Sequence, residues 1–361
     1  GQVLDTPFLT SGAVGRGVAR QLEAFFSVEC AALTNSWTNG ALATLLALGI
    51  GPGDEVIVPA VTFIATANIV ELLGAKPVFV DVNPDSLLLT PELVNGALTP
   101  ATRAVIPVHL FGQMVDMAAL SASLAHRPDI VLLEDAAHCF EGSRDGKGPG
   151  HYSTAAFFSF YATKNVTCGE GGAIITRDAL LMDRIRQTML HGMSVGAADR
   201  FKQGAYQHWD MAHLGVKANL PDLLAALLPS QIDQVRILRE RRSQIADNYL
   251  QSFAGTPLRL PITDPGVVHA HHLFPIHVPP AVRDTCLRRL NDAGIGTTVN
   301  YRSVPSLTYY REKYGYSPSD HPAGHDWGEG TISLPLFPGI TKDEQDHVIS
   351  RVLSEVVPLC A

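Results

Sequence analysis

The sequence is short of cysteine, of long apolar runs and of basic residues. Its five cysteines are odd in number, widely spaced and without a Cys-x-x-Cys pair, which argues against a disulfide framework and a zinc site. They are Cys30, Cys139, Cys168, Cys286 and Cys360. No apolar stretch approaches the roughly eighteen residues that a membrane span requires. We therefore expect a protein of the reducing cytoplasm that does not span a membrane.

The charge balance is mildly acidic, with 27 Lys and Arg against 35 Asp and Glu and a formal charge of -8. A general nucleic-acid or membrane-surface binder needs a basic face, so neither class fits, and an anionic substrate would need a local basic pocket. No charged and then apolar leader opens the chain, so we expect no export. Because the first residue is Gly1 and not Met, we expect the natural start to lie upstream.

A length of 361 residues predicts about two domains that share a large core. Short apolar runs alternate with helical patterns, and continuous apolarity indicates strands that are covered on both faces. The runs lie at 55–60, 77–82, 104–110, 130–135, 155–160 and 173–176. This order predicts an α/β fold with a mostly parallel, doubly wound sheet. Four runs have a polar residue at or next to their end, namely Asp81, His109, Asp135 and Ser159. We expect these residues in one crevice, since such sheets bind ligands at the carboxyl ends of their strands.

The C-terminal part has the pattern of a second, smaller unit. A helical stretch over 221–253 is typical of a connector, and strand, helix and strand patterns follow over 273–301. Thr341 with Glu344 three residues later predicts a capped final helix. We expect a large domain over 1–250, including the N-terminal segment and the connector helix, and a smaller C-terminal α/β domain over 251–361.

Lys164 is the first candidate for chemistry. A single lysine is ordinarily a solvated surface residue. Here it follows the apolar run "AAFFSF" and enters "CGEGG", whose glycines permit close backbone approaches. A lysine in an apolar crevice can lose its proton near neutrality and attack a carbonyl carbon. The surroundings therefore favour Schiff-base chemistry.

Other polar residues have both a structural and a functional interpretation. Asp135 is either a structural carboxylate or the partner of a pyridine nitrogen, which would make the ring an electron sink. Thr38 and Asn39 open a helix, as ordinary caps or as a phosphate site to which Ser159 could add a hydroxyl. Phe63 is either a core residue or a stacking partner for a flat ring.

The segment "VHAHHLF" places His269 and His271 two residues apart, so a metal pair is conceivable. Two neutral imidazoles without a nearby Cys or carboxylate at ligand spacing make a weak site. We therefore expect no metal.

Many segments, in order, resemble the DegT/StrS group of pyridoxal-phosphate (PLP) dependent nucleotide-sugar aminotransferases. They include "GIGPGDEVIVPAVTFIATAN", "RAVIPVHLFGQMVDM", "EDAAH", "SFYATKN", "GEGGAIIT", "KANLPDLLAALLPSQ" and "SLPLFPGIT", and the resemblance covers nearly the whole chain. It implies the aspartate-aminotransferase fold (fold type I), with PLP as cofactor.

By this resemblance Lys164 forms the internal aldimine, Asp135 pairs with the pyridine nitrogen and Phe63 stacks on the ring. The phosphate-cup positions are Thr38, Asn39 and Ser159. His138 lies near the phenolic oxygen of the cofactor. Asn219 reaches the cofactor phosphate of the neighbouring subunit, which implies a homodimer with shared active sites. The sequence departs from the family pattern at Trp37, a glycine in relatives, at Asn300, often histidine, and at His325, often glutamate.

The resemblance implies transfer of the L-glutamate amine, with release of 2-oxoglutarate, to a nucleotide-diphospho keto sugar. His138 favours the 4-keto group of a 6-deoxyhexose over a 3-keto group. The implied setting is deoxyamino-sugar synthesis for lipopolysaccharide and O-antigen or for natural products. Candidate substrate contacts are His191, Lys217, Tyr301 and Arg302. The alternatives are a 3-keto-sugar or cyclitol aminotransferase and a PLP-binding regulatory protein; Lys164 argues against a sugar 3-dehydratase, which has histidine there.

Overall fold

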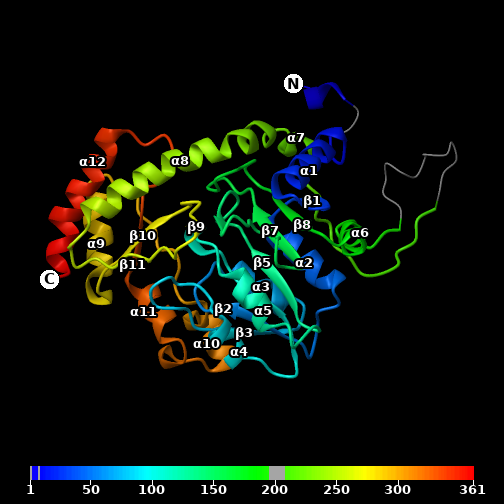
Figure 1. Cartoon of the computed structure of the whole chain (residues 1–361), viewed down its shortest axis with the longest axis horizontal. Coiled ribbons are helices and arrows are strands. Elements are labelled where there is room, and N and C mark those ends of the chain that lie inside the picture. Colours follow the sequence, from blue (N-terminus) through cyan, green and yellow to red (C-terminus); the bar gives the residue numbers. More distant parts are fainter. Residues whose placement is uncertain (1, 7–8, 195–207) are drawn as a thin grey trace.

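The computed structural model describes residues 2–6, 9–194 and 208–361, and its centre is a seven-stranded sheet (Figure 1). The strand order is β1-β8-β7-β5-β4-β2-β3. Every neighbouring pair is parallel except the two that involve β8, which runs antiparallel to β1 and β7. The mostly parallel sheet is therefore confirmed. The strands are β1 Cys30–Thr34, β2 Glu55–Pro59, β3 Lys76–Val80, β4 Thr102–Val105, β5 Val131–Asp135, β7 Ala155–Ser159 and β8 Gly172–Thr176.

Two details of the sheet differ from the prediction. The sequence pattern missed β1, whose five residues form the edge of the sheet beside β8. The run over 104–110 ends as a strand at Val105, because Pro107 has no N–H to donate to a ladder. Beyond it, the chain stays beside β5 through one bridge between Val108 and Asp135.

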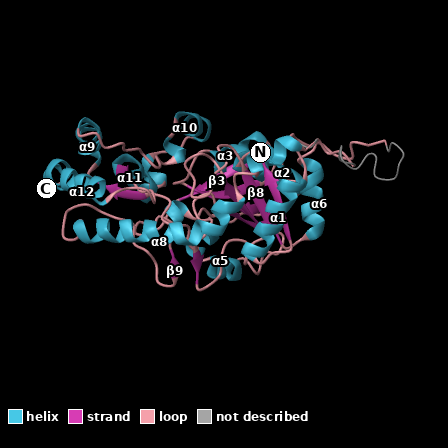
Figure 2. Ribbon diagram, turned by 90° about the horizontal axis from the view of Figure 1, so that it is seen from above, coloured by secondary structure: helices cyan, strands magenta, loops and turns pink. Residues whose placement is uncertain are grey.

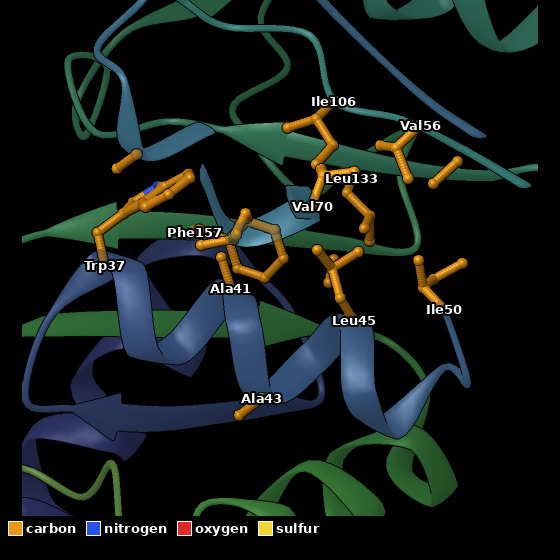
Figure 3. Packing of buried hydrophobic residues seen from close by; sticks show 14 of the residues in the cluster. Trp37, Ala41, Ala43, Leu45, Ile50, Val56, Val70, Ile106, Leu133 and Phe157 are labelled. Carbon is orange, nitrogen blue, oxygen red and sulfur yellow. The ribbon is translucent and has the colours of Figure 1, made fainter. Parts of the chain in front are cut away.

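Helices bury both faces of the sheet. Along β7, Ala155 and Phe157 belong to one apolar cluster, whereas Ala156 and Phe158 belong to another on the opposite face. This alternation follows from the two-residue period of a strand. The Phe157 face packs against α2 (Trp37–Ala47), α3 (Ala65–Leu72) and α6 (Ala179–Thr188), and Figure 3 shows α2 beneath it. On the other face lie α1 (Ala13–Phe26), α4 (Pro91–Gly96) and α5 (Met117–Ser123).

The helix predicted over 221–253 is two helices, α7 (Asp222–Ala225) and α8 (Pro229–Ser252). Pro229 is the first residue of α8, where its missing N–H costs nothing, and it prevents continuation from α7. From there α8 runs past the sheet to the C-terminal unit (Figures 1 and 2).

A separate apolar cluster forms around the end of α8 and the C-terminal elements. It contains β10 (Phe274–His277), which pairs antiparallel with β11 (Thr331–Leu334). The strand expected over 295–301 is absent from the described structure, which has one bridge there, between Thr298 and Ser333. The capping box of Thr341 and Glu344 is confirmed at the start of α12. The other elements are α9 (Pro280–Asp292), α10 (Thr308–Tyr314), α11 (Pro322–Gly330), α12 (Lys342–Arg351) and the short pair β6 (Ser143–Arg144) and β9 (Val267–Val268).

Among the residues described, none of the helices has both the length and the apolar character to cross a bilayer.

Candidate active site

A cavity of about 410 Å³ lies at the carboxyl ends of β5 and β7. It brings together seven of the predicted site residues, namely Thr38, Phe63, Asp135, His138, Ser159, Lys164 and Tyr301. Asp81 and His109 do not line it, contrary to the expectation that all four strand-end residues would meet there. Asp81 accepts the N–H groups of Ala323 and Gly324, 2.9 and 2.8 Å away, at the start of α11. His109 is fully buried and paired with Glu134 at 2.7 Å.

Lys164 enters the cavity from the loop that follows β7. Burial lowers the pKa of its amine to about 8, although the nearby Asp135 opposes this effect. The amine is therefore partly uncharged near neutral pH, as a nucleophilic lysine requires. The nearby Gly171 has little room for a side chain, since a Cβ there would come within 2.6 Å of the Cys168 sulfur.

Asp135 is the last residue of β5 and is 5% exposed. Burial raises the pKa of its carboxyl group, whereas hydrogen bonds from the Ala137 N–H and the Thr66 hydroxyl, together with the charge of Lys164, oppose this effect. The Thr66 hydroxyl donates to Oδ2 at 2.9 Å, and the Ala137 N–H donates to Oδ1 at 3.1 Å. Because Thr66 donates to Asp135, the Thr62 hydroxyl at 2.9 Å must donate to Thr66. These hydrogen bonds hold the Asp135 carboxylate at the cavity wall.

The first turn of α2 forms another wall. Ser36 caps the helix by accepting the Asn39 N–H at 3.1 Å, so this N–H is already used. The side chain of Asn39 donates to Asn35 at 2.9 Å, and Asn39 does not line the cavity. Trp37 and Thr38 do line it, and their N–H groups belong to the first helical turn, which has no intrahelical acceptors. Together with the Ser36, Thr38 and Ser159 hydroxyls, this helix end can bind an anion.

Trp37 packs into the sheet core, with its ring edge-to-face against Phe157 at 6.0 Å (Figure 3). Its indole nitrogen is buried and, among the described residues, has no hydrogen-bond partner. The Trp37 ring therefore packs into the core, although the residue also lines the cavity.

His138 and Tyr301 also line the cavity. Nδ1 of His138 accepts the Phe111 N–H at 3.2 Å, so the neutral ring carries its proton on Nε2. That N–H donates to the Tyr301 hydroxyl oxygen, 3.1 Å away. Phe63 stands beside Tyr301 with ring centroids 5.8 Å apart, and it remains 54% exposed, which leaves an aromatic face for a flat ligand.

Four other predicted site residues do not line the cavity in this chain. Arg302 pairs with Glu329 at 3.2 Å. Lys217 contacts the side-chain oxygen of Asn219, whose amide donates to Ser11 at 3.1 Å. His191 adopts a left-handed backbone, and its N–H donates to Val216.

The sequence interpretation missed several site residues, including Ser36, Thr66, Tyr161, Glu170 and His272. Thr66 carried a usable signal, because it lies one helical turn after Thr62. In "VHAHHLF" the spacing pointed to His269 and His271 as a possible pair, whereas His272 contacts Lys164. The backbone N–H of His271 donates to Nδ1 of His269 at 2.9 Å, and no metal-binding group of three side chains occurs in the described residues.

This sheet topology and this cavity define a PLP-dependent enzyme of fold type I. The residues fit the cofactor: a partly neutral lysine, a buried carboxylate, a helix N-terminus with hydroxyl groups and an exposed aromatic face surround one cavity. Residues 1–353 match the DegT/DnrJ/EryC1/StrS aminotransferase family, and the chain belongs to this family.

Solved structures agree with this assignment. DesV from S. venezuelae, determined with a ketimine intermediate, is 33% identical over 97% of this chain and 91% of its own, with a TM-score of 0.89. The candidate sugar aminotransferase Spr1654 from Streptococcus pneumoniae, in its PMP form, is 28% identical over 97% and 93%, with a TM-score of 0.91. The aminotransferase TlmJ from Streptoalloteichus hindustanus is 27% identical over 100% and 95%, with a TM-score of 0.91. The protein is thus a PLP-dependent sugar aminotransferase that acts on an amino donor and a keto sugar.

Proposed function

We propose that the protein transfers the amine of L-glutamate to the 4-keto group of a nucleotide-diphospho-6-deoxyhexose. The observation that carries the proposal is the meeting of Lys164 and Asp135 in one cavity, with the pKa of the lysine lowered to about 8. PLP, when bound, supplies an electron sink that stabilises negative charge at the carbon bearing the amine.

Separate residues of this protein would bind the cofactor and transfer the proton. Lys164 would hold the cofactor covalently, and as a free amine it would move a proton to and from the reacting carbon, for which a pKa near 8 is suitable. Asp135 would keep the pyridine nitrogen protonated. The first turn of α2, with Thr38 and Ser159, would bind the phosphate, and Phe63 would cover one face of the ring.

The choice of the 4-keto group depends on His138, by resemblance to relatives that carry histidine there. We assign substrate binding to His191, Lys217, Tyr301 and Arg302, of which His191, Lys217 and Arg302 would bind the diphosphate. Arg302 must then exchange Glu329 for the diphosphate, a more highly charged partner.

We also propose a homodimer in which Asn219 reaches the cofactor phosphate of the neighbouring subunit. Apolar side chains that flank Lys217 and Asn219 in sequence support an interface there: Met211, Leu214, Leu223 and Leu227 are 42 to 73% exposed. The five free cysteines agree with a cytoplasmic location. The proposed setting is deoxyamino-sugar synthesis for lipopolysaccharide, O-antigen or a natural product.

To test this, the PLP-loaded protein is incubated with L-glutamate and, one at a time, with UDP-, dTDP- and GDP-linked 3-keto and 4-keto sugars and a keto cyclitol. NMR then locates the new amine in the product. We expect an amine at C4 and an equal amount of 2-oxoglutarate. The Lys164→Ala variant should form no product, whereas Lys313→Ala, a control on the surface of α10, should match the wild type. An amine at C3 or on the cyclitol would replace the proposed substrate, and PLP binding without any product would favour the regulatory protein.

A further inference from the structure

The amine of Lys164 contacts an imidazole that the proposed chemistry does not use. Nζ of Lys164 lies 3.4 Å from Nε2 of His272, a residue of the segment between β9 and β10. His272 is 7% exposed, and its ring lies 4.3 Å from that of His138, measured between centroids. The direction of this hydrogen bond depends on which nitrogen of His272 carries the proton.

The neighbours of His272 decide its tautomer. Asn165 places its amide nitrogen 2.9 Å from a Glu141 carboxylate oxygen and 3.1 Å from the Ala270 carbonyl oxygen. The carbonyl can only accept, so the amide NH₂ must face this pair and the amide oxygen must face the other way. That oxygen lies 3.2 Å from Nδ1 of His272 and can only accept. Nδ1 of His272 therefore carries the proton.

The orientation of Asn165 is itself fixed from α8. Arg242 is 2% exposed, forms an ion pair with Glu141 and donates to the Ala270 carbonyl at 3.2 Å. The two oxygens that the Asn165 amide contacts are thus held in place by a buried guanidinium. Burial also lowers the pKa of His272 well below its usual value, with the charges of Lys164 and Arg242 adding to the effect, so the ring is neutral. A neutral ring with its proton on Nδ1 presents a lone pair on Nε2.

We propose that His272 is a positioning residue: its unprotonated Nε2 accepts a hydrogen bond from Lys164 and holds the amine in place whenever the lysine is not bound to cofactor. This inference rests on the proposed role of Lys164. Other ionisable groups near Lys164 are Asp135 and His138 from the end of β5, and Glu170 and Tyr301 line the same cavity. Of these, Asp135 carries the charge that acts on the lysine most directly.

The test measures Lys164 in the apoprotein. An amine-acylating reagent is applied between pH 6 and 10, and mass spectrometry follows acylation of the Lys164 peptide. In His272→Asn the amide can still contact Asn165 but has no atom at the position of Nε2. The pH at which acylation of Lys164 is half-maximal is the midpoint of this titration. A hydrogen bond that an ammonium donates is stronger than one that a neutral amine donates, so loss of the acceptor should lower the midpoint in His272→Asn by about one pH unit. This shift is a tenfold change in the ratio of ammonium to neutral amine.

Two further variants make the result specific. His272→Gln can place an acceptor near the position of Nε2 and should restore most of the wild-type midpoint. His269→Asn, a matched control, keeps the acceptor for the His271 N–H and should leave the midpoint unchanged. Equal midpoints in the wild type, His272→Asn and His272→Gln would overturn the proposal, as would a shift of the same size in His269→Asn.

A separate measurement keeps the two proposals apart. Borohydride reduction of the PLP-loaded wild type, followed by peptide mapping, should place the pyridoxyl group on Lys164. Attachment to another lysine would end the proposed role of Lys164, while the midpoints of the apoprotein would still report whether His272 holds its amine. If the mapping succeeds and the midpoints do not differ, only the role of His272 is wrong.

Discussion

At the scale of the residue, the site concentrates groups whose ordinary charge is expensive to bury. Lys164 and Asp135 face one cavity, and burial lowers the pKa of the lysine while raising that of the carboxyl group. Each partly compensates the charge of the other. Such opposed shifts are typical of functional sites, because a merely structural position would be filled more stably by an apolar side chain.

The lowered pKa of Lys164 predicts a stability cost in the apoprotein. The amine titrates near pH 8 in the folded chain and near 10.5 when exposed, so the unfolded chain binds more protons between these values. Stability of the wild type should therefore rise with pH across this window, and below pH 8 the full penalty applies. Lys164→Met should be more stable than the wild type by about 1 to 3 kcal/mol at pH 7.

Urea unfolding of both apoproteins at pH 7 and pH 10 checks this expectation. The advantage of Lys164→Met should shrink at pH 10, while Lys313→Met, at an exposed position, should show no comparable gain at pH 7. A lysine that stabilises the apoprotein at pH 7 would contradict the burial argument.

At the scale of the element, the position of α2 depends on close contact with β8. A Cβ on Gly172 would come within 2.7 Å of the Phe158 carbonyl, the Thr34 hydroxyl and the Trp37 nitrogen. Two of these are backbone atoms that cannot move away without shifting an element. Gly172 therefore lets the first turn of α2, the proposed phosphate site, lie directly against the sheet.

Gly172→Ala should displace that turn. We expect a loss of about 1 to 3 kcal/mol in the free energy of unfolding, as for other overpacked sites, and an affinity for PLP lower by about tenfold or more. Urea unfolding and titration with PLP measure the two effects. Gly148→Ala is the matched control, since its Cβ would find its nearest neighbour at 3.8 Å. Wild-type affinity in Gly172→Ala would separate the phosphate site from the end of α2.

At the scale of the whole molecule, the cavity is built by segments far apart in the sequence. It draws on the loops after β1, β2, β5 and β7, and on Asn300 and Tyr301 from the C-terminal third of the chain. α10 and α11 follow these two residues, and Tyr310 and Trp327 pack into the clusters of the large sheet. The C-terminal third therefore closes the site as well as forming its own core.

The proposed homodimer predicts that two inactive variants regain activity when their subunits are mixed. Lys164→Ala lacks the lysine, whereas Asn219→Asp places a negative charge where the partner's phosphate would bind. In an equal mixture half of the dimers are mixed, and one site of each has both native residues. Activity should therefore return to about one quarter of the wild-type value. Activity no higher than the mean of the separate variants, with a monomer in sedimentation, would contradict the shared site.

Much of the local structure follows from the sequence alone. Continuous apolar runs predicted six of the seven sheet strands, because a strand buried on both faces leaves that pattern regardless of its partners. The Thr341 cap was equally local, since both of its members lie within one turn. Lys164 and Asp135 were predicted from residue type and from their place, since Asp135 ends one such run and Lys164 follows another.

Only the tertiary structure decided which of these residues meet. Asp81 and His109 end similar runs, yet one caps α11 and the other pairs with Glu134. Likewise the sequence places three histidines within four residues, and packing of the segment against Asn165 brings His272 into contact with the lysine. The physical reason is that the apolar pattern of a strand or helix depends only on its own short segment, whereas the distance between two side chains depends on every element packed between them.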